Sequence, residues 1–254
     1  PITTTHLEIW IPISMFDQFD FLISNLSNLL LGFPGHRPGG LLLSILLAMV
    51  GIWVGFLIGL VIGTSRGSQI KFLRGLSLGF IEVFRGLPLV LLLVLIHQVI
   101  GGRRFGLDIS PRTAAWVSLA LYSGAYQAEI VYAGLRAVPA ELVESARVLG
   151  GSTGQVFFWV KLRYVLRVML PALVGQAISL FKDTSVVVVI GVADLMTIGR
   201  AVLGSDVKNL PYWVGLYLLV GFLYFLVAFG ISTLARRLER TRQPDDLVYS
   251  LVNF

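Results

Sequence analysis

Hydrophobic residues gather along this chain in stretches that are longer than the helices of a soluble core. The clearest stretch, residues 40–63, contains no charged residue. A helix needs roughly 20 mostly apolar residues to cross the hydrocarbon of a bilayer, so we predict a membrane span there. Glycine recurs at every fourth position in this stretch, at Gly51, Gly55, Gly59 and Gly63. This spacing puts the glycines on one helix face, where a second helix can approach closely.

Four more hydrophobic stretches complete a predicted set of five spans. We place them at about 76–100, 113–135, 171–190 and 212–234. The 76–100 stretch is interrupted near its start, where Gly86 and Pro88 precede most of its apolar run. We therefore expect an all-α, polytopic membrane protein with about five transmembrane helices.

The first 39 residues differ from the rest, because polar residues interrupt their hydrophobic pattern. Six apolar residues still recur at helical spacing: Phe19, Leu22, Ile23, Leu26, Leu29 and Leu30. This pattern predicts an amphipathic helix at the membrane interface, followed by a loop at PGHRPGG. The chain begins at Pro1, with no Met and no signal-peptide pattern, so we expect further residues upstream.

Composition strengthens the membrane prediction. Of the 254 residues, 56% are hydrophobic and only 13% are charged, against roughly 25% charged residues in an average soluble domain. Cys is absent and the three His residues lie far apart, so we expect no metal site and no thiol chemistry. The net charge of +6 would suit nucleic acid in a soluble protein, but membrane proteins carry extra Lys and Arg in their cytoplasmic loops. We therefore predict contact with the lipid bilayer and no nucleic-acid partner.

The distribution of basic residues predicts the orientation. Segments 65–75 and 136–169 and the C-terminal tail hold twelve Lys and Arg, whereas the alternate loops near 101–112 and 191–210 hold five. Since basic loops stay in the cytoplasm, we predict an outside N-terminus and a cytoplasmic C-terminus.

These predictions divide the chain into three parts. An extracytoplasmic or interfacial segment covers residues 1–39. A transmembrane domain covers 40–236 and contains a long cytoplasmic loop at 137–169. The remaining residues, 237–254, form a cytoplasmic tail.

The long cytoplasmic loop has the pattern of two helices joined by a sharp turn. Pro139 can open the first helix, and Gly150 can end it in the left-handed conformation that glycine allows. Ser152 can then cap the second helix. One face of the first helix would carry Leu142, Ala146 and Leu149. Such a hairpin suits a groove of a soluble partner or the surface of the bilayer, and the residue pattern leaves both interpretations open.

The sequence of this loop resembles the EAA loop of ABC-importer permeases. ELVESARVLGGS is followed by FFWVKL, with Glu144, Ser145, Ala146 and Gly150 at the positions of the motif. Ser145 replaces the usual first Ala, a small change. Three more stretches, EVFRGLP, SGAYQAEIVYAGLRAVP and LFKDTSVVVVIGVADL, resemble the polar-amino-acid subfamily of these permeases and follow in the same order. The glycine-rich first span and the long N-terminal extension look closest to the general L-amino-acid permeases, which pair two different membrane subunits.

The resemblance implies a type I importer fold in a bacterial inner membrane. It implies three kinds of partner: a second permease subunit, two cytoplasmic ATP-binding subunits and an extracytoplasmic substrate-binding protein. We expect the second permease subunit to be a paralogue rather than an identical copy. The chain lacks the G-x-x-x-x-G-K-[ST] phosphate-binding loop. We therefore expect no cofactor in this chain and no enzymatic activity of its own, because the partner ATPase subunits would bind ATP and Mg²⁺.

Two groups of residues are candidates for function. The resemblance implies that the 139–160 loop couples transport to the ATPases, through Glu141, Leu142, Glu144, Ala146, Arg147, Leu149 and Gly150. Ionisable groups inside a bilayer are costly and mark a pathway or a pair, and an amino-acid zwitterion needs both an anion and a cation site. Our candidates for the substrate path are Glu82, Arg85, Tyr126, Glu129, Gln176, Ser179, Lys182, Asp183, Thr184 and Ser185. The alternative is that these groups pair with each other as structural clamps or lie at the cytoplasmic interface. We favour this alternative for Glu82 and Arg85, because they precede the apolar run.

The sequence thus predicts the permease of an ATP-driven importer of polar L-amino acids. An importer permease for another small solute, such as a metal chelate or phosphonate, is the nearest alternative, and the KDTS and AYQAE stretches argue against it. A channel or secondary transporter without an ATPase would leave the long hairpin without a purpose, and we find no inverted repeats. A membrane enzyme would lack a plausible catalytic centre.

Overall fold

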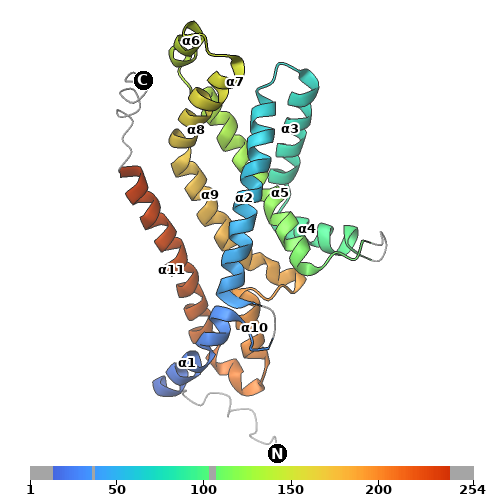
Figure 1. Ribbon diagram of the computed structural model, residues 1–254. Coiled ribbons are helices and arrows are strands. Elements are labelled where there is room, and N and C mark those ends of the chain that lie inside the picture. The colour runs from blue at the N-terminus through green and yellow to red at the C-terminus, as the bar shows by residue number, and fades with distance from the viewer. Residues whose placement is uncertain (1–13, 36–37, 103–106, 241–254) are drawn as a thin grey trace, which may run out of the picture.

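The computed structural model describes residues 14–35, 38–102 and 107–240, and these form helices joined by short connections (Figure 1). The α-helices are α1 (Met15–Leu31), α2 (Gly40–Arg66), α3 (Lys71–Gly86), α4 (Leu89–Val94), α5 (Pro111–Arg136), α6 (Ala140–Val148), α7 (Thr153–Gln155), α8 (Leu162–Val168), α9 (Leu170–Asp183), α10 (Leu195–Gly204) and α11 (Trp213–Arg240). Two π-helical segments, η1 (Leu95–Ile100) and η2 (Val156–Lys161), and two 3₁₀ segments, η3 (Thr184–Ile190) and η4 (Val207–Tyr212), continue some of them. The all-α prediction is confirmed.

The long helix α2 runs through the middle of the molecule and crosses α5 (Figure 1). Gly51, Gly55, Gly59 and Gly63 are all buried on the face of α2 that meets α5. A Cβ at Gly55 would lie 2.9 Å from the Ser123 Cβ, and one at Gly63 would lie 2.6 Å from the Ala128 carbonyl oxygen. No larger residue fits without moving a helix, so the predicted close approach is confirmed.

Three described helical segments are long and apolar enough to cross a membrane: Gly40–Arg66, Leu170–Ile190 and Val207–Arg237. The helix α5, which matches the predicted 113–135 span, is long enough but more polar, and much of it is buried against its neighbours. A helix that is covered by protein on several sides needs fewer apolar residues than one that faces lipid.

The predicted span at 76–100 is broken at the expected interruption, Gly86 to Pro88. The helix α3 ends at Gly86, α4 begins after Pro88, and the two helical parts differ in direction by 103°. Leu87 has extended backbone angles, φ −83° and ψ 131°, because a residue before proline is pushed out of the helical region. If this bent pair counts as one span, four described segments are long and apolar enough to cross a membrane, and the more polar α5 is not among them.

The predicted amphipathic helix near the N-terminus is α1, and Ser14 caps it by accepting a hydrogen bond from the Asp17 backbone N–H. Its apolar face packs against α10 and α11, with Leu29 fully buried. The Phe21 ring stacks on Tyr212 with 4.4 Å between centroids. The helices α1 and α10 lie at one end of the molecule, and α6 lies at the other (Figure 1).

Candidate functional site

The α6–α8 hairpin, residues 139–168, forms one end of the molecule (Figure 1). The helix α6 begins directly after Pro139, as predicted. Gly150 has φ +85° and so adopts the predicted left-handed conformation. Ser152 and Gln155 form a reciprocal capping box: Ser152 Oγ accepts from the Gln155 N–H at 3.3 Å, and Gln155 Oε1 accepts from the Ser152 N–H at 2.9 Å.

The tip of this hairpin exposes apolar side chains. All residues of α6 are described and none is buried, and Val148 and Leu149 are each 87% exposed. Of the three residues expected on one face of this helix, Leu142 and Ala146 are half-buried, whereas Leu149 is exposed. Leu149 is the C-cap residue and lies next to the turn at Gly150, and this explains its greater exposure. Neighbouring exposed hydrophobic residues are typical of an interaction site.

The charged candidates on α6 are solvent-accessible: Glu141, Glu144 and Arg147 are all exposed. Glu141 lies in the first turn and Arg147 in the last turn, which matches the helix dipole. Both therefore have a local role in stabilising α6, and both remain available to a partner.

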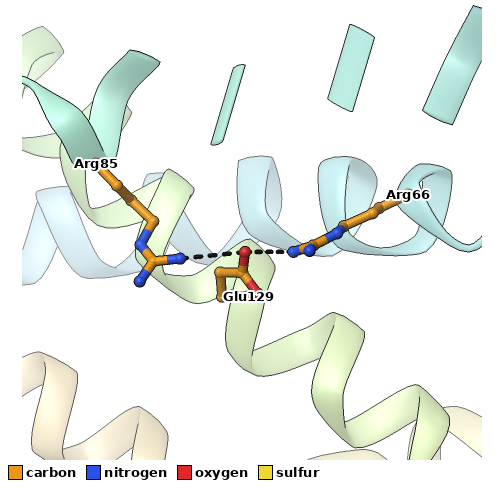
Figure 2. Close-up of polar contacts among 3 residues, drawn as sticks. All are labelled: Arg66, Arg85 and Glu129. Atoms are coloured by element: carbon orange, nitrogen blue, oxygen red, sulfur yellow. Dashed lines mark hydrogen bonds and ion pairs between the residues drawn. The ribbon is translucent and has the colours of Figure 1, made fainter. Parts of the chain in front are cut away.

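The polar candidates in the membrane domain centre on Glu129, in the second half of α5. One of its oxygens, Oε1, accepts a hydrogen bond from Nη1 of Arg66 at the end of α2 and forms an ion pair with Nη1 of Arg85 near the end of α3 (Figure 2). The distance from Arg85 is 3.1 Å, and the contact with Arg66 is the shorter of the two. We call these three residues the Glu129 cluster.

The two arginines of the Glu129 cluster are held to different degrees. The Arg66 side chain is 19% exposed and its guanidinium lies over the Tyr132 ring at 4.3 Å. The Arg85 side chain is 40% exposed and lies 5.1 Å from the Tyr126 ring centroid. Cation–π contacts of this kind favour a positive charge beside each ring. Arg66 is thus more enclosed than Arg85.

The structure corrects the expected pairing of Glu82 with Arg85. Arg85 pairs with Glu129 on another helix, and Glu82 is exposed. Sequence analysis also missed Arg66, which it counted only as a loop charge. The signal was available, because Arg66 lies seven residues after Gly59 and therefore on the glycine face that meets α5.

A pair of tyrosines continues from the Glu129 cluster along α5. The hydroxyl groups of Tyr122 and Tyr126 are 3.4 Å apart, and their ring centroids are 4.9 Å apart. Tyr126 also lies near the Arg85 guanidinium, and Asp183 is half-buried at the end of α9. Arg85, the two tyrosines and Asp183 are thus polar groups that α3, α5 and α9 contribute.

The remaining candidates lie on α9 and η3. Gln176, Ser179 and Asp183 are half-buried, and Lys182 is exposed. The hydroxyl of Thr184 donates to the Phe181 carbonyl at 2.7 Å, and that of Ser185 donates to the Lys182 carbonyl at 2.9 Å. These two hydroxyl groups stabilise the change from α-helix to 3₁₀ helix, so their protons are already used within the chain.

A second buried polar site, which sequence analysis did not predict, lies at the other end of the molecule. Asp194 is fully buried and caps α10, where its carboxylate accepts from the Thr197 N–H at 2.9 Å and from the Thr197 hydroxyl at 2.6 Å. It also accepts from the Tyr224 hydroxyl of α11 at 3.2 Å. Burial raises the pKa of Asp194, and the hydrogen bonds oppose that rise. The sequence does contain a signal for this cap, because an Asp directly precedes an apolar helix and a Thr follows it three positions later.

Comparison with known proteins identifies the family of this fold. Residues 51–243 match the family described as "Binding-protein-dependent transport system inner membrane component". The chain belongs to this family. The permease is therefore a multi-pass inner-membrane subunit of an ABC importer, and the predicted resemblance is confirmed. The channel and secondary-transporter alternatives are excluded.

Individual relatives agree with this identification. The permease is 32% identical over 200 residues to a "Probable glutamine ABC transporter permease protein" of Bacillus subtilis (strain 168), which covers 79% of this chain and 90% of the relative. It is 36% identical over 164 residues to a glutamine transport system permease protein of Escherichia coli (strain K12), which covers 65% and 73%. A solved structure described as an amino acid ABC transporter with histidines has a TM-score of 0.73 and 30% identity, and covers 90% of this permease and 97% of that chain.

Proposed function

We propose that this permease forms, together with a second permease subunit, the membrane path of an importer for polar L-amino acids. The relatives described as glutamine permeases and the structural neighbour described as an amino acid transporter support this cargo. We expect the second subunit to be a paralogue, an extracytoplasmic binding protein to deliver the cargo, and two partner subunits to bind ATP and Mg²⁺.

The observation that carries the cargo proposal is the set of polar groups on α3, α5 and α9: Arg85, Tyr126, Tyr122 and Asp183. An amino-acid zwitterion carries a carboxylate and an ammonium group, and this set offers a cation, Arg85, and an anion, Asp183. Polar groups inside a membrane domain are expensive unless they serve a path or pair with one another. We propose that Gln176, Ser179 and Lys182 face the same path, and that Thr184 and Ser185 shape the helix beside it.

We propose that the α6–α8 hairpin couples this path to the ATPase subunits. The exposed apolar residues Val148 and Leu149 at its tip would be buried in a groove of the partner. Glu141, Glu144 and Arg147 would fix the register of that contact, and Leu142 and Ala146 would brace α6 against the rest of the hairpin. The tight turn at Gly150 would make the tip rigid enough to transmit motion.

The proposed orientation puts this hairpin and the end of α11 in the cytoplasm and α1 and α10 outside. The excess of Lys and Arg in the segments on the hairpin side supports this arrangement. The segments 1–13 and 241–254, which we expect outside and inside, lie beyond the described residues.

Reconstitution tests the proposal. The permease is purified with the partner subunits that accompany it and placed in proteoliposomes, with ATP inside the vesicles and the binding protein outside. Uptake of labelled glutamine, glutamate, arginine and leucine is then measured. We expect ATP-dependent uptake of polar amino acids. A complex that hydrolyses ATP when the binding protein is added, yet imports none of the four, would contradict the amino-acid cargo.

A further inference from the structure

We infer that Arg85 is the carboxylate receptor of the transport path, which exchanges Glu129 for the α-carboxylate of the amino acid as it passes. This inference rests on the proposed cargo and assigns a specific group to recognise it. It concerns the ion pair between Arg85 on α3 and Glu129 on α5, in which a substrate carboxylate could take the place of Glu129.

The Glu129 cluster contains two guanidinium groups and one carboxylate. Both arginines contact the same oxygen, Glu129 Oε1, Arg66 through a hydrogen bond and Arg85 through an ion pair (Figure 2). The cluster therefore carries a formal excess of one positive charge around a carboxylate that is only 27% exposed, and an unbalanced charge at a partly buried position is costly. A passing carboxylate would balance that excess.

Arg85, rather than Arg66, has hydrogen-bond donors available for the substrate carboxylate. Only Nη1 of Arg85 is bonded to Glu129, and among the described residues no acceptor is recorded for its other two nitrogens. Its side chain is 40% exposed, whereas that of Arg66 is 19% exposed and stacked on Tyr132. A guanidinium can bind a carboxylate through two parallel hydrogen bonds, so Arg85 has unused capacity for this contact.

The second arginine makes the exchange possible. A partly buried carboxylate that loses its only partner is strongly destabilised. Glu129 would keep Arg66 when Arg85 turns to the substrate, so neither the carboxylate nor the departing arginine is left unpaired. A cluster built with one arginine and one glutamate would lack this property.

The surroundings of Arg85 also suit a zwitterion. Tyr126 lies next to the guanidinium, Tyr122 follows one turn of α5 away, and Asp183 is half-buried at the end of α9. One turn is about 5.4 Å of helix rise, so an amino acid could place its carboxylate at Arg85 and its ammonium group toward Asp183. Lys182, which is exposed on α9 next to Asp183 in the sequence, is the other cation that could bind the substrate carboxylate.

The test measures cargo binding by the complete importer without its binding protein, using L-glutamine and L-glutamine α-amide, which lacks the carboxylate. Saturation-transfer NMR reports binding of each compound. In Arg85→Gln we expect L-glutamine binding to fall about tenfold or more, while binding of the α-amide changes little. In Glu129→Gln we expect L-glutamine to bind more tightly than in the parental importer, because Arg85 has lost its competitor.

These two variants separate a receptor from a structural clamp. If Arg85 and Glu129 only hold α3 to α5, both variants break the same pair and shift binding and thermal stability in the same direction, which overturns the inference. Equal loss of L-glutamine and its α-amide in Arg85→Gln, or loss of L-glutamine only in Lys182→Gln, also overturns it. Arg74→Gln, an exposed arginine on the same helix, is the matched control. A parental importer that takes up no amino acid contradicts the proposed function instead, whatever Arg85 does.

Discussion

Gly59 of α2 lies directly against Gln127 of α5, and a Cβ at Gly59 would be only 2.8 Å from the Gln127 Cβ. The Gln127 side chain is buried and donates to the Ile52 carbonyl of α2 at 3.0 Å and to Ser123 Oγ at 2.8 Å. The contact thus combines close backbone approach with an interhelical hydrogen bond, both of which hold membrane helices together.

Replacing Gly59 with Ala is expected to destabilise the permease. The added methyl group must push α2 and α5 apart, and overpacking of this kind costs about 1–3 kcal/mol. The matched control is Gly75→Ala on α3, where a Cβ meets no described atom within 4 Å. There alanine should be neutral or stabilising, since glycine inside a helix costs about 1 kcal/mol. The measurement is the thermal midpoint of each purified complex, and equal midpoints would contradict the packing argument.

Removing Arg66 is expected to destabilise the Glu129 cluster by about 1–3 kcal/mol, the cost of losing a charge-assisted hydrogen bond at a partly buried site. The double variant Arg66→Gln, Glu129→Gln should be less destabilised than the sum of the two single variants, because each removes the same contact. Thermal midpoints of the four proteins in this cycle measure the coupling. Strictly additive effects would mean that the ion pair contributes nothing to stability.

Changing Gly150 to Asp is expected to uncouple transport from ATP hydrolysis. A side chain at φ +85° is strained, and it would stand at the hairpin tip beside Leu149. We expect uptake to fall more than tenfold, with normal insertion into the membrane. Gly154→Asp, in the same hairpin but with open space around it and no positive φ, should transport normally. Parental uptake by Gly150→Asp would count against the proposed docking role.

The absence of cysteine from the sequence allows a direct test of orientation. We expect Leu149→Cys to react with a membrane-impermeant maleimide only after cells are opened, and to be protected when the ATPase subunits are bound. Val207→Cys, which is exposed at the start of η4, soon after α10, should react in intact spheroplasts. The reverse labelling pattern would invert the proposed topology.

The buried cap residue Asp194 predicts a pH dependence. Its folded-state pKa is raised by burial, so the folded protein binds this proton more readily than the unfolded chain, whose Asp has a pKa of about 4. Stability from this group therefore increases as the pH falls from neutral toward that ordinary value. We expect the thermal midpoint of the parental protein, relative to that of Asp194→Asn, to be higher at pH 5 than at pH 7. The opposite trend would mean that the hydrogen bonds from Thr197 and Tyr224 outweigh burial.

Local patterns in the sequence were sufficient for much of the fold. The spacing of the four glycines predicted the face of α2 that meets α5, because residues four apart share a helix face. Pro139, Gly150 and Ser152 predicted the start of α6, its end and the cap of the next helix. These features depend on a few neighbouring residues, and so they can be found without knowing the rest of the structure.

The sequence by itself determined the membrane class, the helices, the hairpin and the family resemblance, since each depends on local composition, periodicity or capping. Only the tertiary structure decided which charges meet. Arg85 could have paired with Glu82, three residues away on its own helix, but the packing of both α3 and α2 on α5 brings Arg85 and Arg66 to Glu129. Ion pairs form between groups that the packed helices place within a few ångströms, and separation along the chain does not set that distance.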